Sequence, residues 1–286
     1  MKMRTVNKQT TTVNAMSVDV EDYFQVSAFE PIIDKSSWDN LPHRVVANTE
    51  RILELFAEYD IKATFFTLGW VAERYPQLIK KIVEEGHELA CHGYQHIRVS
   101  EQSPEQFRAD VRLAKDILEQ ISAQSVIGYR AASYSINNAN LWAHDILCEE
   151  GFAYSSSIYP VKHDLYGIPD APRFAYQPLA GKAFKEIPIT TLKFFDKNIP
   201  CGGGGFFRFY PYRFSKWALN NITRQERQAA IFYFHPWEID PDQPKQRGIT
   251  MKTRFRHYLN LGKMESRLRA LLSDFDWDTM ENVFIE

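Results

Sequence analysis

The chain has 286 residues, of which 44% are hydrophobic and 24% are charged. A chain of this length and composition can bury a substantial core, which excludes disorder as its overall state. Its 34 basic and 36 acidic residues leave a formal net charge of -2, which gives no general electrostatic reason to bind nucleic acid or an anionic membrane. An uncharged or mixed-charge substrate fits this balance better.

Export and membrane spanning are not predicted. Residues 1–14 are polar and contain no apolar run typical of a signal peptide, and no later stretch is apolar enough to cross a bilayer. Cys91, Cys148 and Cys201 form no motif and leave one cysteine unpaired in any disulfide scheme, which favours a reducing compartment. We therefore expect a cytoplasmic protein, provided that this is the complete chain.

Apolar runs of strand length alternate with helical patterns along the chain. The predicted strands span residues 15–19, 61–68, 87–91, 126–130, 152–156, 184–189 and 230–235. Between them, an apolar stripe at helical spacing runs from Val45 to Phe56, Ser103 and Pro104 start a second helix, and a third stops near Gly151. This alternation favours a parallel α/β sheet covered by helices, and seven strands indicate a barrel one strand short of the usual eight.

Three segments interrupt this rhythm. Residues 24–41 and 159–182 are long and irregular, and the run Gly202–Gly205 is too glycine-rich for regular structure. Long loops in a compact domain are often functional, although the glycine run is equally typical of a flexible surface turn.

Polar residues with catalytic potential fall at the carboxyl ends of four predicted strands. Three carboxylates, two histidines, an arginine and a further histidine occupy these places: Asp19, Glu21, Asp22, His92, His96, Arg130 and His235. In a barrel of parallel strands, active sites assemble at this face. Any one polar strand end means little, but four together predict an active site there.

His92 and His96 are the sharpest local signal. Two histidines four apart on a helical turn face the same side and can share a metal ion. The spacing matches that of H-E-x-x-H metalloproteases, but Gly93 stands where their glutamate base would be, so a base must come from elsewhere. Two ordinary histidines near a turn are the alternative.

The run Asp19-Val20-Glu21-Asp22 supplies the nearest carboxylates. In extended conformation Asp19 and Glu21 project to one side and Asp22 to the other. Crowded carboxylates at a buried strand end repel one another unless a cation or hydrogen bonds offset their charge, so one can be a metal ligand and another a base. An acidic loop in solvent is the other interpretation.

His235 and Arg130 each follow an apolar run that should be buried. A histidine that emerges from a core strand suits proton transfer near neutral pH, although a satisfied core histidine is the usual explanation. A buried arginine needs a carboxylate partner, so Arg130 either orients Asp19 or makes a purely structural ion pair.

These segments, in this order, resemble the polysaccharide deacetylase family, whose shared part is the NodB homology domain. The likeness lies in four runs: Ser17-Val18-Asp19-Val20-Glu21-Asp22, His92–His96, Tyr129-Arg130-Ala131-Ala132-Ser133-Tyr134-Ser135 and Phe232-Tyr233-Phe234-His235. Longer runs, such as Tyr166–Phe174 and Phe234–Pro241, are similar to the branch found near exosortase and exopolysaccharide gene clusters.

The resemblance implies a distorted (β/α)7 barrel over residues 1–286, one domain with long active-site loops and a C-terminal helical extension. It implies removal of N-acetyl groups from an oligo- or polysaccharide in exopolysaccharide biosynthesis, with a divalent metal ion, zinc being the expected one. The implied roles are Asp19 as base, His235 as acid, Arg130 as the partner of Asp19, and an oxyanion-binding N–H near Ser133 and Tyr134.

Two departures from the family pattern affect the site. The family's metal-binding aspartate falls on Val20, which cannot coordinate, so Glu21 is the expected substitute and Asp22 the alternative. Members of the branch commonly have an aspartate where this chain has Ser155, and a carboxylate there would tune the acid histidine. Its absence leaves the pKa of His235 open.

Three other functions remain compatible with the sequence. The same barrel acting on a small cyclic amide or ureide shares these motifs. A sugar-binding barrel whose catalysis has decayed finds support only in Ser155. Two histidines and a carboxylate also suit a non-haem iron site.

Overall fold

The computed structural model describes residues 12–162 and 166–285, which fold around one curved parallel sheet. The sheet has eight strands in the order β10-β1-β2-β3-β4-β5-β6, with β9 also paired to β1. Their bounds are β1 Asn14–Val20, β2 Thr64–Thr67, β3 Glu88–Cys91, β4 Gly128–Tyr129, β5 Tyr154–Ser155, β6 Lys185–Glu186, β9 Ile231–Phe234 and β10 Trp277–Asp278. A curled parallel sheet of this kind is an open (β/α) barrel, which confirms the predicted fold class.

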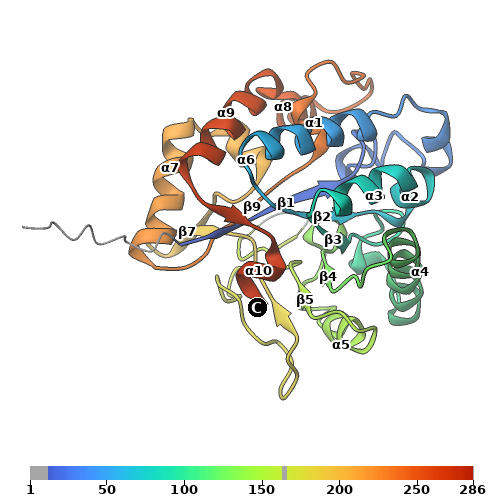
Figure 1. The fold of residues 1–286 in the computed structure, drawn as a ribbon, viewed down its shortest axis with the longest axis horizontal. Coiled ribbons are helices and arrows are strands. Elements are labelled where there is room, and N and C mark those ends of the chain that lie inside the picture. Colours follow the sequence, from blue (N-terminus) through green and yellow to red (C-terminus); the bar gives the residue numbers. More distant parts are fainter. Residues whose placement is uncertain (1–11, 163–165, 286) are drawn as a thin grey trace, which may run out of the picture.

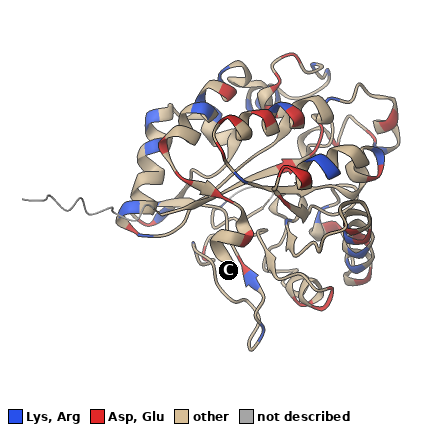
Figure 2. Cartoon of the chain, viewed as in Figure 1, with Lys and Arg blue, Asp and Glu red and all other residues tan. Residues whose placement is uncertain are grey.

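Helices wrap the outside of the sheet (Figure 1). They are α1 Val45–Glu58, α2 Gly69–Arg74, α3 Pro76–Glu84, α4 Pro104–Ser122, α5 Trp142–Glu149, α6 Gly204–Phe209, α7 Tyr212–Asn220, α8 Met251–Tyr258, α9 Leu261–Asp274 and α10 Met280–Phe284. The predicted start of α4 is confirmed, because Ser103 and Gln106 form a reciprocal capping box before Pro104. In the view of Figure 2, acidic and basic residues are interspersed along these helices.

Two apolar cores lie on opposite faces of the sheet. The larger core packs the helices onto the outer face, whereas the smaller one fills the barrel interior with Phe66, Tyr154, Ile187, Ile231 and Tyr233. The C-terminal helix α10 closes the amino end of the barrel, since its first N–H groups are bonded to the starts of β2 and β3. The opposite, carboxyl end remains available for a site.

The seven predicted strands all coincide with observed strands, but the sequence missed β10 and the hairpin of β7 (Thr191–Phe194) and β8 (Lys197–Pro200). The interpretation of Gly202–Gly205 as irregular is wrong, because α6 begins at Gly204. A side chain at Gly203 would come within 2.6 Å of the Tyr233 ring. Close approach to neighbouring groups therefore explains Gly202, Gly203 and Gly204, whereas Gly205 has no neighbour within 4 Å.

The long segment 159–182 covers the barrel only in part. Tyr159 packs at the barrel interior, with its ring centroid 5.6 Å from that of Tyr134. Arg173, by contrast, lines a cavity with Phe284 of α10 at the amino end. Over the described residues, no helix has the length and apolar character required to cross a bilayer.

Candidate active site

The carboxyl ends of β1, β3, β4 and β9 bring the predicted residues together. Parallel pairing aligns Val18 of β1 with Phe234 of β9, so Asp19 and His235 emerge side by side. Pairing of β1 with β2, of β2 with β3 and of β3 with β4 brings His92 and Arg130 to the same edge. The polar residues at this end are buried, except that the His235 side chain is 20% exposed. The site therefore opens to solvent beside His235.

Arg130 and Asp19 form a fully buried ion pair. Arg130 Nη1 lies 2.5 Å from Asp19 Oδ1 and 2.9 Å from Ser17 Oγ, and Nε donates to the carbonyl of Ser156 at 3.2 Å. The guanidinium also lies over the Phe66 ring, 3.9 Å from its centroid. These contacts fix one oxygen of Asp19 and leave Oδ2 directed at His235, whose Nε2 is 3.9 Å away.

Glu21, His92 and His96 form a candidate metal centre. Each offers one ligand atom, and the three atoms lie within 4.8 Å of one another. His92 Nδ1 lies 2.7 Å from the carbonyl oxygen of Arg130, which acts as acceptor and leaves Nε2 unprotonated for a metal. Glu21 Oε2 lies 3.1 Å from His96 Nε2, and among described residues neither Glu21 Oε2 nor His96 Nδ1 has a hydrogen-bond partner although both are buried. This donor set fits a divalent cation such as zinc.

The two histidines do not share a helical turn, contrary to the sequence-based interpretation. Residues 92–96 form a loop in which Gly93 has φ +76° and His96 has φ +53°. Their ring centroids are nevertheless 5.3 Å apart, because the left-handed conformations of Gly93 and His96 bring the two rings together without a helix.

Burial favours the uncharged forms of the three ligand side chains. Burial, with a contribution from nearby Asp19, raises the pKa of Glu21 to about 7, although His235 opposes the shift. Burial also lowers the pKa of both His92 and His96. A bound cation would offset the negative charge that burial disfavours on Glu21. Neutral imidazole is the form of histidine that binds a metal.

Asp22 lies outside this centre, which corrects its place as an alternative ligand. Its Oδ2 accepts the backbone N–H groups of Arg44 at 2.6 Å and Val45 at 2.9 Å, and its Oδ1 accepts that of Tyr23 at 2.8 Å. These bonds cap the start of α1. Asp22 therefore has a structural role.

His235 is held by a carboxylate that the sequence analysis missed. Its Nδ1 lies 2.8 Å from Glu238 Oε1, while Glu238 Oε2 accepts from Arg208 Nε at 2.7 Å. Arg208 also donates to the carbonyls of His257 and Leu259, at 2.9 and 2.7 Å. This arrangement directs His235 Nε2 towards Glu21 Oε1, 3.3 Å away.

The charges around His235 stabilise its protonated form. Burial alone would lower its pKa, but Glu21, Glu238 and Asp19 outweigh burial and raise it to about 9. Arg208 and His235 together hold the pKa of Glu238 at about 2, against the effect of its burial. With this pKa the ring keeps its proton at neutral pH and can act as a proton donor.

Trp237 and its neighbours fix the plane of the His235 ring. The indole stacks on His235 at 5.2 Å between centroids and, on its other face, on His257 at 4.2 Å. Its Nε1 lies 3.4 Å from Glu21 Oε1. The segment Pro236–Ile239 thus supplies both an aromatic wall and the carboxylate of Glu238.

Ser155 does not face His235, which corrects the expected link between the two. Its hydroxyl donates to Ser157 Oγ at 2.7 Å and lies beside the buried carboxylate of Glu186. An aspartate introduced there would face Glu186. The carboxylate partner of His235 comes instead from Glu238.

The predicted oxyanion segment adopts the strained backbone often found at functional sites. Ser133 and Tyr134 have φ values of +53° and +51°. The Tyr134 N–H is bonded to the carbonyl of Ala131 at 3.0 Å, which leaves the Ser133 N–H as the candidate donor of the two. The Tyr134 ring packs against Tyr233, 5.0 Å between centroids, below Arg130.

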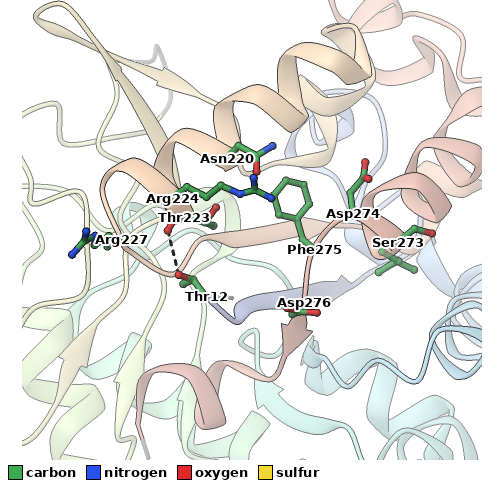
Figure 3. Close-up of a pocket in the computed structure, with 10 residues that line it drawn as sticks. Thr12, Asn220, Thr223, Arg224, Arg227, Ser273, Asp274, Phe275 and Asp276 are labelled. Atoms are coloured by element: carbon green, nitrogen blue, oxygen red, sulfur yellow. Dashed lines mark hydrogen bonds between the residues drawn. The ribbon is translucent and has the colours of Figure 1, made fainter. Parts of the chain in front are cut away.

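A large cavity lies away from this site, near the start of β1. Its volume is about 770 Å³, and Thr12, Arg224, Arg227 and Asp276 are among its lining residues (Figure 3). None of the predicted site residues lines it.

Two family models match adjacent parts of the chain. Residues 36–145 match the model described as polysaccharide deacetylase, and residues 156–285 match a domain of unknown function, DUF3473. The first contains His92, His96 and Arg130, while the second contains His235 and Glu238.

Curated relatives include deacetylases of peptidoglycan and of chitooligosaccharides. A peptidoglycan-N-acetylglucosamine deacetylase of Bacillus cereus is 32% identical over 74 residues, which are 26% of this chain and 27% of that protein. A chitooligosaccharide deacetylase of Bradyrhizobium sp. is 27% identical over 111 residues, 39% of this chain and 48% of that protein. The matched segments thus span less than half of these relatives.

Solved structures share the fold over nearly the whole chain. A structure described as a candidate polysaccharide deacetylase from Mycobacterium smegmatis has a TM-score of 0.62 at 18% identity, covering 96% of this chain and 88% of that one. An allantoinase has a TM-score of 0.59 at 17% identity, covering 95% and 88%. At these identities the likeness concerns the fold alone.

Proposed function

Because the chain belongs to the polysaccharide deacetylase family, we propose that it is a metal-dependent hydrolase that removes N-acetyl groups from an N-acetylated oligo- or polysaccharide. One observation carries this proposal. Two proton-transfer groups, Asp19 and His235, flank a single Glu21-His92-His96 ligand set in a buried site. Amide hydrolysis needs this combination, since water must lose a proton and the leaving nitrogen must gain one.

The residues divide the chemistry between them. A divalent ion held by Glu21, His92 and His96 would supply Lewis acidity and make water easier to deprotonate. Asp19, oriented by Arg130, is placed to accept the proton of the attacking water. The N–H of Ser133 is our candidate for stabilising the negative charge that develops on the carbonyl oxygen.

His235 completes the reaction by donating a proton to the departing sugar nitrogen. Proton transfer of this kind contributes about 10²–10⁴ in rate. The protonated state that Glu238 favours by its bond to Nδ1 is the state the donor requires.

The context of the reaction stays a prediction. The runs Tyr166–Phe174 and Phe234–Pro241 are the basis for proposing a role in exopolysaccharide biosynthesis, and the cysteines are the basis for a cytoplasmic location. The retained Asp19, His92, His96 and His235 favour an active enzyme over a decayed, sugar-binding barrel. Allantoinase shares the fold only, so a small ureide substrate has no further support.

Acetate release and metal content test the proposal together. Purified protein should contain close to one zinc or another divalent ion per chain by mass spectrometry and should release acetate from chitooligosaccharides. Asp19→Asn should keep the metal and lose most activity, whereas Asp39→Asn, an exposed carboxylate paired with Arg74, should change neither. Hydrolysis of allantoin without acetate release would overturn the substrate class, and metal and oligosaccharide binding without turnover would favour the decayed barrel.

A further inference from the structure

The tip of the β7–β8 hairpin exposes two adjacent phenylalanines. Phe194 is 49% exposed and Phe195 is 83% exposed, the highest value for any large hydrophobic side chain among the described residues. Their rings contact each other edge to face, 4.8 Å between centroids. Adjacent exposed apolar side chains of this kind can mark a site of interaction with another molecule or with a membrane.

The backbone at the tip holds Phe195 in a conformation that is unfavourable for a phenylalanine. Phe194 pairs with Lys197, so Phe195 and Asp196 form a two-residue turn. Phe195 has φ +50°, a left-handed conformation that such turns normally give to glycine. A bulky aromatic residue thus occupies a position where folding alone favours glycine. Strain of this kind is typical of functional positions.

The base of the hairpin is firmly attached to the barrel. Leu192 is buried and Ile199 packs on the main core. Asn198 Nδ2 donates to the carbonyl of Pro160 at 2.8 Å, and Arg173, itself paired with Glu226, donates to the carbonyl of Thr191. The two phenylalanines therefore project from a fixed support.

Two lysines flank the aromatic tip. Lys193 and Lys197 are exposed, and in the described part of the chain neither forms an ion pair. Asp196 is the single acidic residue of the tip. Although the whole chain has a formal net charge of -2, this tip carries a local positive charge beside apolar rings.

We propose that the β7–β8 tip docks the protein onto an anionic lipid bilayer, with Phe194 and Phe195 inserted at the interface and Lys193 and Lys197 against lipid headgroups. Apolar rings flanked by basic residues suit the boundary between acyl chains and acidic headgroups. A stable protein interface needs about 800 Å² per partner, more than a convex two-residue tip offers.

Docking of this kind is peripheral and reversible. Two partly inserted rings and two lysines give binding that depends on both apolar contact and salt, far weaker than a spanning helix. Docking would place the barrel near saccharides attached to or made at a membrane. The inference does not depend on the deacetylase proposal, because the tip contains none of the site residues.

Vesicle co-sedimentation of the full chain tests the proposal. The probes are vesicles of phosphatidylcholine alone and of phosphatidylcholine mixed with phosphatidylglycerol. Phe195→Gly should weaken binding to the mixed vesicles about tenfold, since it removes one ring, while leaving the thermal midpoint unchanged or higher because glycine suits the turn. Lys193→Gln and Lys197→Gln should each weaken it about fivefold and reduce its salt dependence.

A matched control and a second readout make the result decisive. Phe255→Ser on α8 removes another exposed ring, 56% exposed, and should leave vesicle binding unchanged. Failure of the wild-type chain to bind mixed vesicles, or equal loss in Phe255→Ser and Phe195→Gly, would overturn the proposal. So would a wild-type dimer that Phe195→Gly converts to monomer in size-exclusion chromatography, which would identify a self-association surface. Acetate release from soluble oligosaccharides, measured in parallel, reports separately on the proposed function.

Discussion

Replacing Glu238 with glutamine should separate proton donation from the rest of catalysis. Glu238 accepts from three donors: its Oε1 accepts from the Nδ1 and the backbone N–H of His235, and its Oε2 accepts from Arg208 Nε. A glutamine has one oxygen, so its NH₂ group must face one of these donors. Breaking a buried ion pair typically lowers the free energy of unfolding by about 3–5 kcal/mol. For Glu238→Gln we expect a loss of about 3 kcal/mol, because Arg208 keeps its bonds to the carbonyls of His257 and Leu259.

The kinetic effect should depend on the leaving group. With His235 no longer fixed, kcat on an N-acetyl sugar should fall by about a hundredfold with KM little changed, because positioned proton donation is worth about 10²–10⁴ in rate. An activated aryl acetate, whose leaving group departs without protonation, should lose much less. Since Glu238 is one of the carboxylates that raise the pKa of His235, the basic limb of the pH profile should also move to lower pH.

The measurement is a pair of pH–rate profiles, one for each substrate, on protein with verified metal content. His235→Ala should show the same leaving-group dependence, and Glu58→Gln, an exposed carboxylate paired with Arg269, should show none. Equal loss on both substrates, or a change in KM alone, would refute the positioning role of Glu238.

Three further predictions concern the metal ligands, Gly204, and Glu88 at the amino end of the barrel. Glu21→Gln should lose its metal by mass spectrometry, whereas Asp22→Asn should keep the metal and lose about 1 kcal/mol in denaturant unfolding, because it weakens a helix cap. Gly204→Ala should destabilise by about 1–3 kcal/mol and lower N-acetyl hydrolysis, since its Cβ would lie 2.3 Å from a carboxylate oxygen; Gly205→Ala, with no neighbour within 4 Å, should be neutral or stabilising. Burial raises the pKa of Glu88 to about 6 from 4.5, so its contribution to stability is present below pH 4.5 and lost as pH rises through 6. In the wild-type chain the free energy of unfolding should therefore fall by about 2 kcal/mol across this pH range, and Glu88→Gln should lack that fall. Unfolding free energies that change equally with pH in both proteins would contradict this prediction.

The sequence predicted the parts of the site that follow directly from strand ends. Apolar runs locate the parallel strands, and parallel strands bring their carboxyl ends to one edge. Asp19, Glu21, His92, Arg130 and His235 were found in this way. The expected alternation also separated Glu21 from Asp22; the structure keeps them apart, but through a turn after β1 in which the Glu21 N–H bonds to the Asp19 carbonyl.

Long-range partners could not be predicted in the same way. Arg208 and Glu238 are thirty positions apart, and their pairing depends on the path of α6 past the end of β9. The cap that Asp22 provides for α1 spans a similar gap along the chain. One local signal was available: Pro236 followed by Glu238, three residues after His235, is the pattern of a capping box, and the structure contains one there.

The division of the site along the chain gives the segment of unknown function a specific role. The proposed metal ligands and Asp19 lie in residues 19–96, whereas Arg208, His235 and Glu238 all lie in the segment 156–285 that matches DUF3473. Neither part contains both proton-transfer groups. They meet because β9 pairs with β1 in register, which brings His235 Nε2 to 3.3 Å from Glu21. In our proposal, therefore, the C-terminal segment supplies the acid together with the ion pair that holds it, and the barrel becomes a deacetylase only when that strand closes against the first.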